Sequence, residues 1–256
     1  LFGNNNTYIL DENNQVIELN LSGNHIEHIF PFEGFPFLRK LDLSKNNITE
    51  IKNLDSLELL EELKLNNNQI TKIENLSNEK LNVLDLSVNK IENIEGLESL
   101  KYLKHLILSG NEIKVIQEIS HLTSLLKLHL DSNKILEIDN LYELKNLISL
   151  KLGYNKITKI KNLHTLLKIE ELQLRMNDIE EIEGLENCIN LKDLDIRSSV
   201  DNSSDSFNKK IRNAETMKNN YILIVWEQEV NDWTVAVRNV KTKEQIVMKK
   251  EELIEK

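Results

Sequence analysis

An asparagine recurs at nearly constant spacing along most of the chain. It always occupies the sixth position of the same phrase, L-x-L-x-x-N-x-I. The spacing is 22 residues throughout, except for 21 between Asn68 and Asn89. Eight occurrences in one register indicate a stack of similar turns, each contacting its neighbours. The asparagines are Asn24, Asn46, Asn68, Asn89, Asn111, Asn133, Asn155 and Asn177.

The phrase predicts a short strand in every turn. Because side chains alternate along a strand, both leucines are expected to point inward, and successive strands then form a parallel sheet. The asparagine amide can both donate and accept, so we expect it to be buried and bonded to the backbone of neighbouring turns. Isoleucines two and five residues further on, and leucines on short helical turns of the outer side, would complete the core.

This pattern resembles the leucine-rich repeat family in its 22-residue form, to which the regulatory subunit of type-1 protein phosphatase belongs. The resemblance covers residues 17–197. It implies an α/β solenoid of about eight to nine repeats with a parallel concave sheet. We assign the solenoid with its amino-terminal cap to residues 1–199, and a small α+β segment to residues 200–256. Residues 8–19 are expected to form the cap as a strand, a turn at Asn13-Asn14 and the first repeat strand.

Charge is unevenly distributed along the chain. The net charge is −10, from 32 Lys and Arg against 42 Asp and Glu. Residues 201–256 carry ten of each sign, so residues 1–200 carry the whole imbalance, 22 basic against 32 acidic. An acidic solenoid repels phosphate backbones and is a poor general nucleic-acid surface. Basic protein partners are favoured for it.

The single cysteine, Cys188, excludes an internal disulfide and is expected to be inert packing on an outer turn. Its solitary occurrence indicates a reducing compartment. No apolar run approaches the roughly 18 residues that a bilayer span needs, and no signal-peptide pattern opens the chain. We expect a cytoplasmic or nuclear location. An organellar location stays open because the first residue is Leu rather than Met.

Exposed positions around each L-x-L form columns on the concave sheet, where solenoids of this kind bind partners. Three groups of residues make a candidate site for a protein partner, because an apolar and aromatic centre with a polar rim is typical of binding hot spots. The alternative is an ordinary solvated sheet. The groups are an apolar spot (Val83, Val88, Ile107), a diagonal (His105, His129, Tyr154, Met176) and a basic streak (Lys127, Lys151, Arg175, Arg197).

No motif for catalysis is found in the sequence: G-x-x-x-x-G-K, G-x-S-x-G and H-E-x-x-H are all missing. His105, His129 and Asp131 could share one face of the sheet, but no fourth metal ligand is evident. We therefore expect a protein that is not an enzyme and has no cofactor and no metal.

The segment after residue 200 departs from the repeat. Residues 204–220 have the period of a helix, and YILIVW (221–226) is typical of a buried central strand. TVAVRNV (234–240) alternates like a half-buried strand, and residues 244–256 predict a further strand and helix.

This order of elements is similar to the last third to half of the anticodon-binding domain of class II aminoacyl-tRNA synthetases, threonyl-tRNA synthetase in particular. The resemblance implies that Glu229 and Arg238 occupy base-reading positions, since a guanidinium suits guanine acceptors and a carboxylate accepts from amino groups. Trp226 stands where the family has Gly, and Ser204 where it usually has Asn. Three roles stay open: a cap for the solenoid, docking to RNA or a ribonucleoprotein, and a second protein-binding module.

Together these features predict a non-catalytic protein-interaction scaffold or adaptor, with translation or ribonucleoprotein assemblies as its setting. One alternative is a regulatory subunit of a type-1 protein phosphatase. The other is a tRNA-binding accessory part of an aminoacyl-tRNA synthetase.

Overall fold

The structure is a computed structural model that describes residues 6–185, 187–196, 221–224, 234–239 and 245–249. These residues fall into two units, a repeat array and a three-stranded sheet near the carboxyl end. In the described part of the chain no helix is long and apolar enough to cross a membrane.

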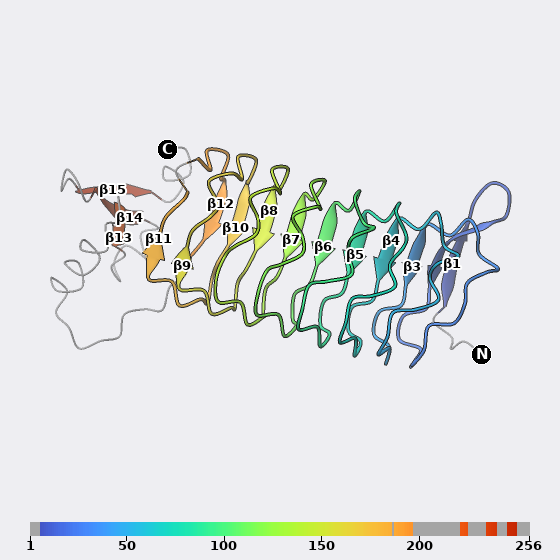
Figure 1. Cartoon of the computed structure of the whole chain (residues 1–256). Coiled ribbons are helices and arrows are strands. Elements are labelled where there is room, and N and C mark those ends of the chain that lie inside the picture. Colours follow the sequence, from blue (N-terminus) through green and yellow to red (C-terminus); the bar gives the residue numbers. More distant parts are fainter. Residues whose placement is uncertain (1–5, 186, 197–220, 225–233, 240–244, 250–256) are drawn as a thin grey trace. The chain divides into compact units, whose positions relative to one another are not determined.

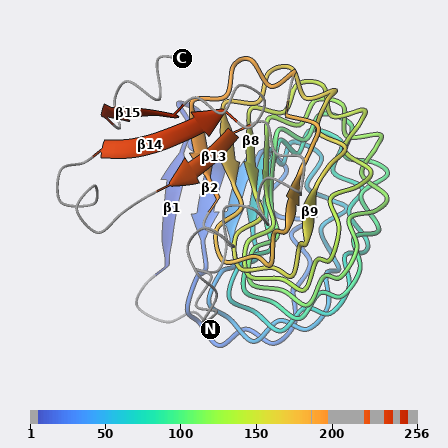
Figure 2. The ribbon, with the colours of Figure 1, turned by 90° about the vertical axis from the view of Figure 1, so that its left-hand side faces the viewer.

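A ten-stranded sheet forms one side of the repeat array (Figure 1). The first two strands are antiparallel, and every later strand is parallel to its neighbour and in register, as where Leu41 faces Leu63. Viewed along the stack, the strands lie on one side and the outer turns on the other (Figure 2). In spatial order the strands are β1 (Thr7–Leu10), β2 (Val16–Asn20), β3 (Lys40–Asp42), β4 (Glu62–Lys64), β5 (Val83–Asp85), β6 (His105–Ile107), β7 (Lys127–His129), β8 (Ser149–Lys151), β10 (Glu171–Gln173) and β12 (Asp193–Asp195).

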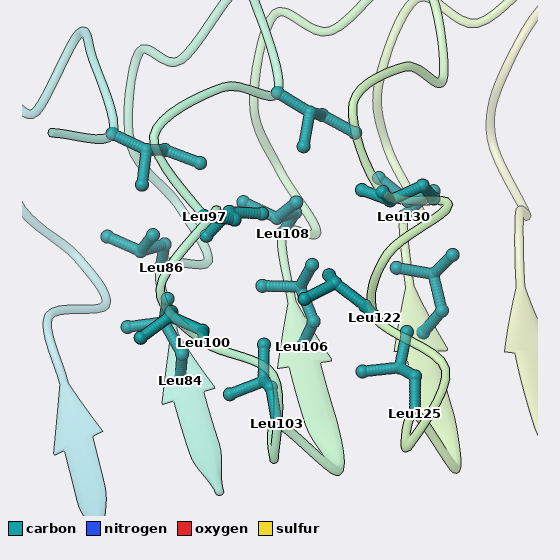
Figure 3. Close-up of a cluster of buried hydrophobic side chains, with 14 of the residues drawn as sticks. Leu84, Leu86, Leu97, Leu100, Leu103, Leu106, Leu108, Leu122, Leu125 and Leu130 are labelled. Carbon is teal, nitrogen blue, oxygen red and sulfur yellow. The ribbon is translucent and has the colours of Figure 1, made fainter. Parts of the chain in front are cut away.

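The parallel-sheet solenoid expected from the repeat is confirmed. From the second phrase to the eighth, both leucines are buried, and the outer leucines meet them from the opposite side. Figure 3 shows this between Leu84 and Leu106 on the strands and Leu100 and Leu122 on the outer turns. Because each apolar layer is shared by adjacent repeats, no repeat has a core of its own.

The buried asparagines form the expected ladder. In Asn111, Nδ2 donates to the carbonyl oxygens of Leu86 (3.0 Å) and Leu108 (2.9 Å), while Oδ1 accepts from the Ile91 amide (3.0 Å). The other asparagines from Asn68 to Asn177 repeat this scheme. Each amide therefore satisfies three backbone groups, one in its own repeat and two in the preceding repeat, and its own polar atoms are bonded as a buried polar side chain requires.

The outer segments differ from the prediction, because none of them is helical in the described residues. Except in the 21-residue repeat, each contains two successive i→i+3 turns, as where Leu57 N donates to Leu54 O (3.0 Å) and Leu60 N to Leu57 O (3.1 Å). Leucines three residues apart fit such turns as well as they fit a helix. A segment this short cannot add enough i→i+4 bonds to offset the cost of starting a helix.

A second polar ladder on the outer side was not predicted. The asparagines at its rungs have positive φ, and their Nδ2 atoms donate to carbonyls of the preceding repeat. Gly96 takes the same place, where a Cβ would lie 2.1 Å from the Ile73 carbonyl oxygen, so no other residue fits without a backbone shift. The asparagines are Asn53, Asn75, Asn140 and Asn162. A two-stranded sheet of β9 (Lys159–Ile160) and β11 (Glu181–Ile182) also lies outside the main sheet.

The amino-terminal cap forms as expected. The chain turns between β1 and β2 with Asn14 at φ +59°, and the Asp11 carboxylate accepts from the Asn13 and Gln15 amides. In the 21-residue repeat, Asn78 replaces an outer leucine and is 3% exposed. Its Nδ2 bonds the Leu54 and Leu57 carbonyls, whereas its Oδ1 has no partner among the described atoms.

Near the carboxyl end, β13 (Tyr221–Ile224), β14 (Thr234–Asn239) and β15 (Gln245–Lys249) form an antiparallel sheet. The three strands fall where the sequence predicts them. Among them β14 is central, which corrects the prediction that YILIVW forms the central strand. Arg238 lies in β14, in register with Ile222 and Gln245. Glu229, Ser204, Trp226 and the helix predicted over 204–220 lie outside the described residues.

Candidate protein-binding surface

One column of residues at the end of the sheet strands has an unusual backbone. Each of its members precedes a ladder asparagine and has positive φ, between +54° and +71°. L-residues other than Asn and Gly avoid this region because Cβ crowds the neighbouring carbonyl oxygen. We call this column the turn ridge; it consists of Gly23, Lys45, Asn67, Val88, Gly110, Ser132, Tyr154 and Met176.

Three members of the turn ridge are large and exposed. Val88, Tyr154 and Met176 have φ values of +54° to +55° and are 52%, 48% and 58% exposed. A left-handed backbone costs an L-residue about 1–2 kcal/mol. Neither core packing nor backbone preference accounts for these side chains. Backbone strain of this kind concentrates at functional sites.

Tyr154 is joined to the next repeat through Arg175. The guanidinium carbon lies 5.3 Å from the centroid of the tyrosine ring, a cation–π contact. Gly153 makes room for it, because a Cβ there would lie 3.2 Å from Arg175 Cγ and 3.0 Å from Asp131 Oδ1. Tyr154, Arg175 and Met176 thus form one exposed cluster across two repeats.

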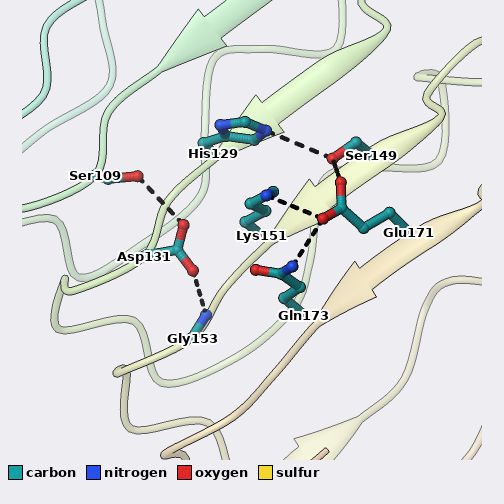
Figure 4. Close-up of polar contacts among 8 residues, drawn as sticks. All are labelled: Ser109, His129, Asp131, Ser149, Lys151, Gly153, Glu171 and Gln173. Carbon is teal, nitrogen blue, oxygen red and sulfur yellow. Dashed lines mark hydrogen bonds and ion pairs between the residues drawn. The ribbon is translucent and has the colours of Figure 1, made fainter. Parts of the chain in front are cut away.

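A polar network lies on β8 and β10 of the sheet (Figure 4). Glu171 Oε1 accepts from Lys151 Nζ (2.9 Å) and Gln173 Nε2 (2.7 Å), and its Oε2 accepts from the buried Ser149 hydroxyl. Burial raises the pKa of Glu171, but the hydrogen bonds from Ser149 and Lys151 outweigh it and leave this pKa below its usual range. Glu171 is therefore held as a carboxylate.

A second carboxylate, Asp131, is also satisfied within the array. Its Oδ1 accepts from the Gly153 amide (3.0 Å) and its Oδ2 from the Ser109 hydroxyl (3.3 Å). Sequence reasoning missed both networks. The register offers one signal, since β8 and β10 are in register and place Glu171 diagonal to Lys151.

Two histidines of the surface are held neutral. Burial, and then the charge of Lys151, lower the pKa of His129, whose Nε2 lies 3.5 Å from the Ser149 hydroxyl. Burial, and then Lys127, lower the pKa of His105. Both imidazoles are thus uncharged at neutral pH.

The structure brings most of the predicted surface together. Across the strands, Val83 faces His105 and His105 faces Lys127, while Ile107 faces His129 and His129 faces Lys151. Val83 and Ile107 are half-buried, whereas Val88 is exposed on the turn ridge.

The basic streak is smaller than the sequence suggests. Lys151 is neutralised by Glu171, and Arg197 lies outside the described residues. Lys127 and Arg175 remain as exposed cations. No group of three or more His, Cys, Asp or Glu side chains in the described part could hold a metal ion. Cys188 is buried.

The geometry defines the class: a leucine-rich repeat solenoid with an exposed sheet face. Family models support this for the amino-terminal part. Residues 14–70 match a leucine-rich repeat model, and residues 58–101 match a model of two such repeats. Residues 183–256 match the model of an anticodon-binding domain.

Two similar solved structures are bacterial. A leucine-rich repeat protein of Leptospira interrogans has a TM-score of 0.65 at 27% identity, over 77% of this chain and 52% of that one. Internalin C2 of Listeria monocytogenes has a TM-score of 0.62 at 27% identity, over 69% of this chain and 78% of that one.

Relatives of the carboxyl-terminal part are threonine–tRNA ligases. The ligase of Nautilia profundicola is 47% identical over 53 residues, which are 21% of this chain and 9% of the ligase. That of Sulfurovum sp. is 40% identical over 57 residues, 22% of this chain and 9% of the ligase. The chain thus spans only about a tenth of these ligases.

Proposed function

We propose that this chain is a non-catalytic adaptor whose repeat array binds a protein partner on the sheet face. Val88, Tyr154 and Met176 are its anchors, and the half-buried Val83, His105, Ile107, His129 and Lys151, with the exposed Lys127 and Arg175, surround them. The observation that supports the proposal most is the coincidence of exposure and unfavourable φ at the three anchors. The fold alone would favour Gly or Asn there, as at Gly23, Asn67 and Gly110.

The test is quantitative affinity purification with mass spectrometry. The full chain is compared with a variant carrying Val88→Asn, Tyr154→Asn and Met176→Asn. Asparagine tolerates a left-handed backbone, so the variant keeps the fold and loses only the exposed side chains. A matched control carries Val115→Asn and Leu136→Asn, which remove apolar side chains of similar exposure, 54% and 55%, away from the turn ridge.

We expect the same partner to be recovered with the full chain and the control, and at least about tenfold less with the triple variant, since hot-spot side chains typically contribute 2 kcal/mol or more. Equal recovery of the partner with the triple variant and with the full chain would contradict the proposal. So would a loss with the control of the same size.

A second function is favoured by the match of residues 183–256 to an anticodon-binding domain. We infer that this segment contacts tRNA through Arg238 in β14 and through Glu229. An electrophoretic shift of total tRNA by the full chain, weakened by Arg238→Ala and by added salt, is the expected result. Arg212→Ala removes a cation of the same segment as a control. No shift at low salt would contradict this role.

The phosphatase-regulator hypothesis stays a prediction without support from the matches described above. Its test is co-purification with type-1 phosphatase that is lost on combined substitution of Asp42 and Asp85, which lie between the two leucines of the second and fourth phrases.

A further inference from the structure

The charges on the sheet face differ in whether they already have partners. In the half of the sheet that contains the candidate surface, the carboxylates of Asp85, Asp131 and Glu171 all accept hydrogen bonds within the array. No acidic side chain among these three is left to receive a basic ligand. Beyond these three, β12 contributes Asp193 and Asp195 to this half of the sheet, in register with Glu171 and Gln173.

The cations of the same half are different. Lys127 and Arg175 are exposed, and no carboxylate of the described residues lies within 4.0 Å of either. At the other end of the sheet, Lys40 pairs with Glu18 (2.7 Å) and Lys64 with Glu62 (3.0 Å). Lys127 occupies the same strand position as Lys40 and lacks such a neighbour, because His105 precedes it in register where Glu18 precedes Lys40, and Ser149 follows it.

Arg175 is prepared for a carboxylate. Its cation–π contact with Tyr154 restricts the side chain. The N–H donors lie in the guanidinium plane, where they suit the two oxygens of a carboxylate. An arginine held in this way loses little additional conformational freedom on binding.

The two cations are spaced for an extended chain. Lys127 lies in β7, and Arg175 lies two residues after the end of β10, which is two strands further along the sheet. Two strand spacings and four residues of register give a separation of roughly 15 Å, which about five extended residues span. Tyr154 and Met176 adjoin Arg175 and offer an apolar contact next to it.

Resting on the proposed function, we propose that this surface binds an extended acidic segment of the partner protein. One carboxylate contacts Arg175, another contacts Lys127, and an apolar side chain near the first packs on Tyr154 and Met176. A nucleic acid fits less well, because it carries a phosphate at every nucleotide, whereas the surface offers two exposed cations, Lys127 and Arg175.

The probe is a display library of random ten-residue peptides, selected against the full chain and then against a Tyr154→Asn variant to subtract other sites. We expect the specific peptides to be enriched in Asp or Glu about five residues apart, with an apolar residue near one of them. Peptides that need Tyr154 but show no acidic enrichment would overturn this inference and leave the proposed function standing. If no selected peptide depends on Tyr154, the result contradicts both this inference and the proposed function.

Charge reversal provides the second measurement, by fluorescence anisotropy of the best selected peptide. Arg175→Glu and Lys127→Glu should each weaken binding at least tenfold, whereas Lys114→Glu, an exposed lysine of the outer side, should leave binding within twofold. A peptide with Lys in place of the acidic residue should regain affinity for Arg175→Glu. Absence of this rescue, or equal effects of all three variants, would overturn the inference. So would a poly(U) oligonucleotide that binds the same residues more tightly than the peptide.

Discussion

At the scale of single residues, backbone conformation separates side chains that serve the fold from side chains that do not. The turn ridge imposes a positive φ on every member, and Gly, Asn, Lys and Ser meet it with little exposed apolar surface. Val88 is the most strained of the three large members, because its branched Cβ fits the left-handed region poorly. Its side chain also lies against Gly110, where a Cβ would be 3.3 Å from Val88 Cγ2.

We therefore predict that Val88→Asn stabilises the chain. Relief of the left-handed strain should raise the free energy of unfolding by about 0.5–1 kcal/mol in urea titrations. Val115→Asn is the control, since Val115 is similarly exposed but is not among the positive-φ residues. A destabilised Val88→Asn would mean that Val88 packs usefully on the array.

The sequence contains a signal for the positive φ of the turn ridge. Gly23, Asn67 and Gly110 recur at one position of the repeat, and such residues at a fixed place indicate positive φ. The strain at Tyr154 and Met176 follows from that period. The contact of Arg175 with Tyr154 does not, because it depends on rotamers that neither spacing nor strand register determines.

At the scale of the element, the repeat tolerates changes in its outer turns but not in its strands and ladders. The strands and the asparagine ladder could be predicted from the 22-residue repeat. Side chains alternate along a strand, which places both leucines inside, and a buried amide must bond to backbone groups. The outer turns did not follow, because leucines three residues apart are compatible with both a helix and successive turns. The 21-residue repeat shows this tolerance, with Asn78 in place of a leucine.

Asn78→Leu should stabilise this repeat. The carbonyls of Leu54 and Leu57 keep their bonds to the Leu57 and Leu60 amides, and the unpartnered Oδ1 is removed. We expect a gain of about 1 kcal/mol in the free energy of unfolding, from apolar burial and the loss of an unsatisfied acceptor. Asn111→Leu is the contrasting control and should be strongly destabilising, because it leaves three backbone groups of two adjacent repeats without their partners. Equal destabilisation by both would show that the short turn depends on its amide.

At the scale of the whole molecule, stability should depend on pH through the histidines of the sheet. The pKa of His105 and that of His129 are both lowered by burial in the folded chain. As the pH falls below about 6.5, the unfolded chain therefore binds more protons than the folded chain. The free energy of unfolding decreases in this range. Glu171, whose pKa is lowered, keeps its contribution until more acidic conditions.

We predict that the free energy of unfolding decreases between pH 7 and pH 5, and that His129→Gln reduces the decrease. Urea titrations at both pH values measure it. His25→Gln, at an exposed turn of the first repeat, should leave the decrease unchanged. A decrease that is unaffected by His129→Gln would contradict the assignment to buried imidazole.

Oxidative footprinting of the full chain with the recovered partner tests the central claim most directly, because Met and Tyr are readily oxidised and report side-chain access. The account predicts that the partner protects Met176 and Tyr154, which are 58% and 48% exposed. It also predicts unchanged oxidation at Tyr102 and Tyr142 on the outer side, 63% and 49% exposed. Protection of Tyr102 or Tyr142 with Met176 and Tyr154 still oxidised would contradict the sheet face as the binding surface.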